Sequence, residues 1–442
     1  MSTICAISTP AGIGGIAVVR VSGKDAISIV DSLFEGKHSL TTAKGYSMHY
    51  GTIADLDDAV VSIFRAPHSF TGEDVVEISC HGSLFIQQEL LHRLTGAGCK
   101  PAQPGEFTKR AFLNGKIDLS QAEAVADLIS AQSKAAHNIA LSHIRGGVSE
   151  RLNHLREQLL KITSLLELEL DFADHEELEF ADRSELSKLA HEIDLHIGKL
   201  VSTFKLGNAL KNGISVAIIG PTNAGKSTLL NALVGEDRAI VSDIHGTTRD
   251  TIEETVSIDG ILFRFIDTAG IRQTDNQIES IGIDRSRKAA EKADIILYVL
   301  DSANMDTTKD DILKDIDTTD KTIITIYNKV DLLQEQPCIS NDNEIYLSAK
   351  HGDIEPLRKL LVKHLPNETP NEILISNTRH YEALCLAQSA IRRVQQGLQQ
   401  DLSGELLSMD LHDCLDALGE ITGEITSEDV LGNIFSHFCI GK

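Results

Sequence analysis

The spacing of apolar residues divides the chain into stretches with different patterns. Between Met1 and about Lys116, β-rich runs at residues 15–21 and 74–78 alternate with stretches of helical spacing. Short runs rich in Val and Ile predict strands, and their mixture with helices predicts a compact α+β domain. The chain has 442 residues, which is too long for one hydrophobic core, so several domains are expected.

From Leu119 to about Leu210 the pattern becomes helical. Six apolar residues follow one another at intervals of four, three, four, three and four, namely Val148, Leu152, Leu155, Leu159, Ile162 and Leu166. These intervals place all six side chains on one face of an α-helix. They predict one long amphipathic helix.

Apolar strands alternate with helices from Asn212 to about His364, which is typical of a doubly wound parallel sheet. A Pro-Asn-Glu-Thr-Pro-Asn stretch beginning at Pro366 ends this pattern, and three further helices are predicted, at residues 381–397, at residues 403–418 and toward Phe438. We expect the helical segments on either side to pack together with the sheet domain inserted between them. The predicted domains are residues 1–117, 118–211, 212–366 and 367–442.

Composition narrows the class of protein. Hydrophobic residues make up 42% of the chain, charged residues 24% and aromatic residues 4%, as in a folded protein packed mainly by aliphatic side chains. The net charge of −24 counts against indiscriminate nucleic-acid binding and leaves open a specific RNA contact through a local basic patch.

Seven scattered cysteines without a C-x-x-C pair suit free thiols in a reducing cytosol. With no long apolar run and no signal peptide pattern, we expect a soluble cytoplasmic protein that does not enter a membrane.

A candidate phosphate site lies at the start of the third domain. Residues 220–227, Gly-Pro-Thr-Asn-Ala-Gly-Lys-Ser, match the pattern G-x-x-x-x-G-K-[ST] between a predicted strand at 214–219 and a helix at 228–233. Glycines let backbone N–H groups cradle phosphate at the helix N-terminus, Lys226 neutralises its oxygens, and the Ser227 hydroxyl ligates Mg²⁺. The bare pattern also fits a glycine-rich turn, so its context matters.

Two further segments belong beside such a site. A strand at residues 261–266, paired with residues 251–258 through an Asp259-Gly260 turn, ends in Asp-Thr-Ala-Gly at residues 267–270. Asp267 can hold Mg²⁺ through water, and the Gly270 amide can reach the γ-phosphate. Upstream, Thr248 is placed to complete the Mg²⁺ shell, in a loop expected to order with GTP and to relax after hydrolysis.

Base selection is assigned to residues 328–331, Asn-Lys-Val-Asp, which follow an apolar strand at residues 322–327. The Asp331 carboxylate can accept from N1–H and the exocyclic amine of guanine, whereas adenine would leave it unpaired. Residues 348–350, Ser-Ala-Lys, come after a strand at residues 344–347 and would complete the base pocket. The ordered set of segments predicts GTP binding and hydrolysis.

The residue that aligns the attacking water is less evident. Many GTPases place Gln after D-x-x-G, but here that position is Ile271. The polar segment 272–282 is the nearest source of another aligning side chain. Charge on the transition state needs a cation, for which Arg249, Arg272 or a bound metal are the alternatives.

Taken with these motifs, the chain resembles the MnmE (TrmE) family of tRNA-modification GTPases over essentially its whole length. The segments that carry the resemblance outside the GTPase motifs are TPAGIGGI (9–16), FTGEDVVE (70–77), PGEFTKRAFLNGK (104–116) and FCIGK (438–442). The resemblance implies a multidomain α/β fold class: a Ras-like P-loop GTPase domain inserted into a helical domain and preceded by an α+β domain for folate binding and dimerisation.

The resemblance also implies ligands and site residues. Arg20, Glu77, Lys116 and Lys442 would hold a 5-formyl- or methylene-tetrahydrofolate. K⁺ would replace an arginine finger, with Asn223, Ser242, Ile244 and Thr247 as ligands, and Glu279 would orient the water. The Mg²⁺ ligands would be Ser227, Thr248 and Asp267, and the catalytic residues would be Glu279, Lys226 and Thr248. The full set assigned to GTP is Asn223, Ala224, Gly225, Lys226, Ser227, Thr228, Ser242, Asp243, Ile244, His245, Gly246, Thr247, Thr248, Asp267, Thr268, Ala269, Gly270, Asn328, Lys329, Val330, Asp331, Ser348, Ala349 and Lys350.

The sequence is compatible with two functions. The family implies a homodimer that joins the FAD-containing partner MnmG in a heterotetramer and adds a carboxymethylaminomethyl or aminomethyl group to C5 of the wobble uridine of tRNA. The alternative is a ribosome-assembly or signalling switch that uses GTP only to bind and release partners. An N-terminal domain carrying Arg20, Glu77 and Lys116 favours the first, because a plain switch has no reason to carry it.

Overall fold

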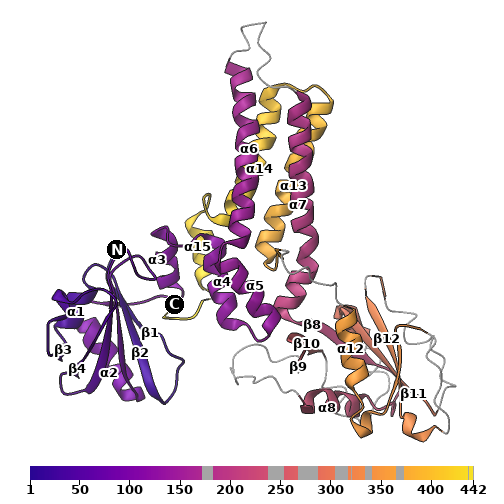
Figure 1. Cartoon of the computed structure of the whole chain (residues 1–442), viewed down its shortest axis with the longest axis horizontal. Helices are drawn as coiled ribbons and strands as arrows, with labels where there is room; N and C mark the ends of the chain where they lie inside the picture. The colour runs from indigo at the N-terminus through magenta and orange to yellow at the C-terminus, as the bar shows by residue number, and fades with distance from the viewer. Residues whose placement is uncertain are drawn as a thin grey trace. The chain divides into compact units, whose positions relative to one another are not determined.

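The computed structural model describes residues 1–171, 183–236, 253–266, 287–303, 317–319, 321–333, 341–364, 373–436 and 438–441. The chain forms two compact units (Figure 1). One unit consists of Met1–Ile129, His143–His191 and Ser389–Lys442, and the other of Ser130–Ser142 and Glu192–Gln388. Each unit contains one β-sheet, and the two sheets differ in strand direction.

The first sheet has seven strands in the order β3-β4-β5-β6-β2-β1-β7. Its strands are β1 (Ile4–Ile7), β2 (Gly14–Ser22), β3 (Phe34–Gly36), β4 (Ser47–Ile53), β5 (Asp57–Phe64), β6 (Val75–Gly82) and β7 (Lys100–Pro101). All neighbours are antiparallel except β1 and β7. The β-rich runs at 15–21 and 74–78 correspond to β2 and β6, so the predicted α+β arrangement is confirmed.

Helices bury one face of this sheet and part of the other. The helical elements here are α1 (Ala26–Asp31), the 3₁₀ turn η1 (Leu40–Thr42), α2 (Leu84–Gly96) and α3 (Glu106–Leu113). Leu90 and Leu94 of α2 are fully buried in a cluster with sheet residues such as Val19 and Ile78. Phe107 of α3 forms a separate cluster with Ile4, Ala6 and Ala102. Alternating side chains of a strand reach opposite faces, so α3 covers the β1 end of the second face.

The helical segments are α4 (Leu119–Ser130), α5 (Lys134–Ile144), α6 (Gly147–Asp171), α7 (Arg183–Asn212), α13 (Thr378–Gln399), α14 (Gly404–Thr422) and α15 (Glu428–Ser436). All six apolar residues predicted to share one face of a long helix lie on α6 and are at most 1% exposed. The helix α14 packs along α6 (Figure 1), which confirms that segments before and after the nucleotide-binding motifs lie together. Within the described residues, no helix combines the length and apolar character needed to cross a membrane.

The second sheet has six strands in the order β13-β12-β11-β8-β10-β9. They are β8 (Ile214–Ile219), β9 (Glu254–Ile258), β10 (Ile261–Phe265), β11 (Ile295–Asp301), β12 (Thr322–Asn328) and β13 (Glu344–Leu347). Every pair is parallel except β9 and β10, which form the predicted hairpin with Ile258 opposite Ile261. The sheet is therefore the parallel, doubly wound type that the sequence predicts.

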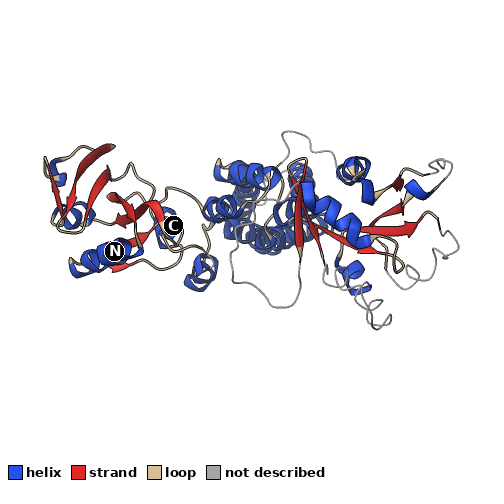
Figure 2. Ribbon diagram, turned by 90° about the horizontal axis from the view of Figure 1, so that it is seen from below, coloured by secondary structure: helices blue, strands red, loops and turns tan. Residues whose placement is uncertain are grey.

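Helices lie on both faces of the second sheet, as Figure 2 shows in blue beside the red strands. On one face, α8 (Lys226–Glu236) and α12 (Glu355–Lys363) contribute Leu229, Leu233 and Leu357 to a cluster with β8, β11 and β12. On the other face, Ala289 and Ala290, from helical residues 287–292, pack with apolar residues of β8 and β11. Coverage of both faces explains why all six residues of β8 are buried and all but Ser215 are apolar.

Candidate nucleotide and N-terminal sites

Four parallel strands of the second sheet bring polar residues to one edge. The strand β8 leads into Gly220, β11 ends at Asp301, β12 ends at Asn328, and β13 is followed by Ser348. The strand β8 lies between β10 and β11, so the strand order reverses at β8 and its carboxyl end is a topological switch point. Ligands of open α/β sheets bind at such a point.

The phosphate loop of residues 220–227 has the backbone that an anion cradle requires. The φ angles of Gly220, Asn223 and Gly225 are 145°, 62° and 95°, a region that favours glycine and tolerates Asn. A Cβ atom at Gly220 would collide with the Val299 carbonyl, and one at Gly225 with Nδ2 of Asn328. The loop leads directly into α8, which begins at Lys226. Backbone N–H groups are therefore available to an anion at the helix N-terminus.

Lys226 lies within this loop. Its Nζ donates to the carbonyl oxygens of Gly220 at 2.8 Å and Pro221 at 2.7 Å. Burial lowers the pKa of the Lys226 ammonium below its usual value. A partly desolvated cation at a helix N-terminus attracts phosphate more strongly than one in bulk water.

Asn328 links the phosphate loop to the segment assigned to base selection. This residue is 2% exposed. Its Nδ2 donates to the Ala224 carbonyl at 2.9 Å, and its Oδ1 accepts from the amides of Lys329 at 2.8 Å and Ala349 at 3.0 Å. One buried side chain thus joins residues 220–227, 328–331 and 348–350.

Asp331 has a carboxylate positioned by a neighbouring loop. Its Oδ1 accepts a 2.6 Å hydrogen bond from the Ser348 hydroxyl. This bond is the largest cause of the lowered pKa of Asp331, and the nearby charges of His351 and Lys350 act in the same direction. An ionised carboxylate can accept two N–H groups, which matches the Watson–Crick edge of guanine.

Asp301 is a site residue that the sequence analysis missed. The Nζ of Lys329 lies 2.7 Å from its Oδ2, so the long side chain of Lys329 is held across the sheet edge. Burial alone would raise the pKa of Asp301, but hydrogen bonds from Lys329 and the Ala303 amide hold it below the usual value. The sequence feature that could have identified Asp301 is an Asp at the carboxyl end of an apolar strand, next to the strand that ends at Asn328.

The other residues predicted at this site divide into two groups. Ser227 and Thr228 lie in the first turn of α8, and Val330 and Lys350 lie in the short 3₁₀ turns η2 (Val330–Leu332) and η3 (Ala349–His351). Residues outside the described ranges are Ser242, Asp243, Ile244, His245, Gly246, Thr247, Thr248, Arg249, Asp267, Thr268, Ala269, Gly270, Ile271, Arg272 and Glu279. Their assigned roles stay predictions.

In the first unit, Arg20 and Glu77 face each other on the antiparallel strands β2 and β6. The Nη2 of Arg20 lies 2.8 Å from Oε1 of Glu77, and Nε donates to the same oxygen at 2.9 Å. Nη1 of Arg20 donates to the Gly441 carbonyl at 3.4 Å, which brings the C-terminal segment to this pair. Lys442 follows Gly441 in the chain but lies outside the described residues.

Lys116 contacts the loop between β5 and β6, and this loop also contacts Arg20. Its Nζ donates to the Pro67 carbonyl at 3.1 Å. Phe70, in the same loop, lies with its ring centroid 5.8 Å from Cζ of Arg20, and the Phe107 ring lies at 5.7 Å. Neither phenylalanine was predicted to be at the site, because only the fold shows which aromatic rings surround Arg20.

The chain is similar to known proteins over its whole length. Residues 3–116 match the family described as GTP-binding protein TrmE N-terminus, and residues 119–439 match the MnmE helical domain. The chain is 55% identical to the tRNA modification GTPase MnmE of Parabacteroides distasonis over 468 aligned positions, which cover 100% of both chains. It is 50% identical to the protein of the same name from Bacteroides thetaiotaomicron, with 100% of this chain and 99% of the relative covered.

A solved structure shows a weaker likeness. A variant of Era from Aquifex aeolicus bound to GDP and AlF₄⁻ is 26% identical over 40% of this chain and 66% of that chain, with a TM-score of 0.27. The two family matches and the full-length relatives are sufficient by themselves: the chain belongs to the MnmE family of tRNA modification GTPases.

Proposed function

We propose that the protein binds and hydrolyses GTP with Mg²⁺, and that this cycle serves the modification of the wobble uridine of tRNA. The observation that carries the nucleotide assignment is the position of Asp331. Its carboxylate, held by Ser348, lies at the same sheet edge as the phosphate loop, and Asn328 connects the two. A carboxylate there accepts from guanine and rejects adenine.

Each part of the site has a proposed task. Lys226 and the amides of the phosphate loop would bind the phosphates, and Ser227, Thr248 and Asp267 would hold Mg²⁺, which would neutralise the charge that develops on the phosphate. Asn223, Ser242, Ile244 and Thr247 would hold K⁺ in place of an arginine finger, and Glu279 would orient the water. Asn223 supports the K⁺ assignment in two respects: it is exposed on the phosphate loop, and its carboxamide oxygen is a donor suited to a hard cation.

The first unit is proposed to bind a 5-formyl- or methylene-tetrahydrofolate, which would supply the one-carbon group. The donor set suits such a ligand. The Glu77 carboxylate can accept from the amino and ring N–H groups of a pterin, Arg20 would hold that carboxylate at the same end of the ligand, and Lys116 can pair with a carboxylate of the glutamate tail. Lys442 is assigned to the same site, and the bond between Arg20 and the Gly441 carbonyl is consistent with that assignment.

The proposed function also includes protein partners. We expect a cytoplasmic homodimer that joins the FAD-containing partner MnmG in a heterotetramer. Together they would add a carboxymethylaminomethyl or aminomethyl group to C5 of the wobble uridine. Because the net charge of this chain is −24, we expect the partner to supply most of the basic surface that docks tRNA.

The test is deletion of the gene followed by mass spectrometry of nucleosides from total tRNA. The modified wobble uridine should disappear, return with the wild-type gene, and stay absent with Lys226→Ala. Lys359→Ala is the matched control, since this exposed lysine lies on α12 of the same domain away from the sheet edge, and it should restore the modification. Intact modification after deletion would refute this function and favour a ribosome-assembly or signalling switch.

A further inference from the structure

The loop of residues 67–73 contacts two of the residues proposed to bind folate. Phe70 places its ring centroid 5.8 Å from Cζ of Arg20, and the Pro67 carbonyl accepts from Nζ of Lys116. Gly72, at a φ of 77°, lies so close to Lys116 that a Cβ atom would be 3.2 Å from its Cγ. The loop therefore restrains both cationic side chains, and for Arg20 it adds to the ion pair with Glu77.

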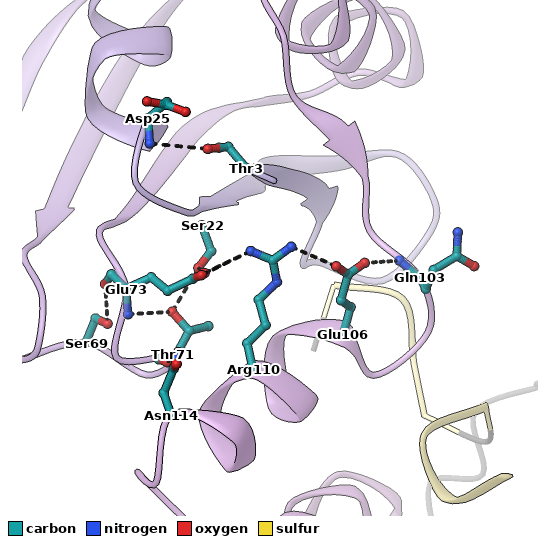
Figure 3. A network of polar contacts seen from close by, with 10 residues as sticks. All are labelled: Thr3, Ser22, Asp25, Ser69, Thr71, Glu73, Gln103, Glu106, Arg110 and Asn114. Atoms are coloured by element: carbon teal, nitrogen blue, oxygen red, sulfur yellow. Dashed lines mark hydrogen bonds and ion pairs between the residues drawn. The ribbon is translucent and has the colours of Figure 1, made fainter. Parts of the chain in front are cut away.

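The loop is anchored at its end by Glu73. Both carboxylate oxygens of Glu73 accept from Nη1 of Arg110, at 3.2 and 3.0 Å, and Oε2 also accepts from the Ser22 hydroxyl at 2.8 Å. Two bonds at Thr71 support this anchor: its hydroxyl lies 2.8 Å from that of Ser22, and its carbonyl accepts from Nδ2 of Asn114 at 2.7 Å. Figure 3 shows these side chains converging from β2, α3 and the loop.

Arg110 is the central cation of this network. It is 3% exposed, and its Nη2 donates to Oε1 of Glu106 at 2.8 Å, so one guanidinium joins two carboxylates. Its Nε has no hydrogen-bond partner among the described residues. Charge-assisted bonds out of water are strong, and removal of one partner of a buried pair is strongly destabilising. The helix α3 thereby holds the loop with Arg110 and packs Phe107 against Arg20.

We propose that Arg110 and Glu73 are positioning residues for the N-terminal ligand site. They hold the loop so that Phe70 lies on the guanidinium of Arg20 and the Pro67 carbonyl restrains Lys116. This inference rests on the proposed folate site, and its ligand is a reduced folate. Neither residue touches the ligand in this account, and both act through Arg20 and Lys116.

The test compares two substitutions around the same arginine in the full chain. Glu73→Gln weakens the anchor of the loop, whereas Glu106→Gln weakens the other side of Arg110 and leaves the loop bonds intact. The two carboxylates are similarly exposed, at 17% and 23%, so they form a matched pair. Affinity for 5-formyl-tetrahydrofolate is measured by calorimetry, and amide hydrogen exchange is measured in peptides that span residues 65–75.

Glu73→Gln should weaken 5-formyl-tetrahydrofolate binding by about tenfold, since a net hydrogen bond to a charged group corresponds to roughly that factor. It should also accelerate exchange in the loop. Glu106→Gln should change affinity by less than about twofold and leave loop exchange unaltered. Phe70→Leu removes the ring from Arg20 without touching the anchor, so affinity should fall while exchange at residues 71–73 stays slow.

Equal effects of Glu73→Gln and Glu106→Gln on affinity and loop exchange would overturn the positioning role. GTP hydrolysis, which uses the other unit, should be unchanged in all three variants, and circular dichroism of each variant serves as the folding control. A wild-type protein that does not bind 5-formyl-tetrahydrofolate would refute the proposed folate site. The exchange comparison would then decide by itself whether Arg110 and Glu73 hold the loop.

Discussion

Asn328 and Ala224 are 104 residues apart in the chain, yet the Asn328 amide donates a 2.9 Å hydrogen bond to the Ala224 carbonyl. The bond runs from the carboxyl end of β12 to the loop after β8, with β11 between the two strands. Because the other end of the same amide accepts from Lys329 and Ala349, the phosphate and base segments share one anchor. Nucleotide binding by either segment should therefore depend on the Asn328 side chain.

We predict that Asn328→Ala lowers the stability of the nucleotide-binding domain by about 2–4 kcal/mol, since each buried group left without a partner costs roughly 1–3 kcal/mol. Urea denaturation followed by circular dichroism measures the loss of stability. The transition whose midpoint changes when GDP is added belongs to the nucleotide-binding domain, and its midpoint should be lower in Asn328→Ala. Asn343→Ala, at an exposed asparagine before β13, is the control and should leave the midpoint nearly unchanged. An equal midpoint for Asn328→Ala and wild type would contradict the anchoring role.

Asp331→Asn should move nucleotide preference from GTP toward xanthosine triphosphate. The amide of Asn can donate to the second carbonyl of xanthine, whereas the exocyclic amine of guanine then faces a donor. We expect GTP affinity to fall by on the order of a hundredfold or more, with competition binding as the measurement. Unchanged guanine selectivity in this variant would refute the base pocket.

The pH dependence of nucleotide binding should respond to Ser348. The hydrogen bond from Ser348 lowers the pKa of Asp331, so the ionised carboxylate persists as the pH falls and is lost only through that lowered pKa. In Ser348→Ala the pKa of Asp331 rises toward its usual value. GDP affinity should then begin to fall at a higher pH than in wild type. The affinity is measured by titration with a fluorescent GDP analogue at a series of pH values from neutral to acidic. Superimposable curves of affinity against pH for wild type and Ser348→Ala would count against the role of Ser348.

Turnover of GTP should collapse when Na⁺ replaces K⁺. Loss of a group that stabilises transition-state charge lowers turnover roughly a hundredfold or more. Asn223→Gly removes the proposed ligand without straining the backbone, because the φ of 62° at this position suits glycine. Phosphate release measured in KCl and NaCl should differ strongly for wild type and little for this variant, whereas equal wild-type rates in both salts would sink the K⁺ assignment.

Local patterns in the sequence were sufficient to predict much of the fold. The spacing of Val148 through Leu166 identifies the buried face of α6 because helical periodicity depends only on neighbouring turns. The strands β8, β10, β12 and β13 are likewise evident from apolar runs that end in recognisable motifs.

Contacts that depend on strand order and on loop packing were not predictable in the same way. The pair of Asp301 and Lys329 requires β11 to lie beside β12, and the placement of Phe70 and Phe107 around Arg20 requires the loop and α3 to meet β2. Nothing in the local sequence of Arg110 distinguishes it from a surface arginine, although it is 3% exposed. These residues become visible only when distant segments are brought together.

Isothermal titration calorimetry with Mg²⁺ and either GTP or ATP tests the nucleotide assignment most directly. We predict measurable heat and saturation with GTP, at least a thousandfold weaker binding of ATP, and loss of the GTP signal in Lys226→Ala. Absence of GTP binding to the folded wild-type protein, or equal affinities for GTP and ATP, would contradict it.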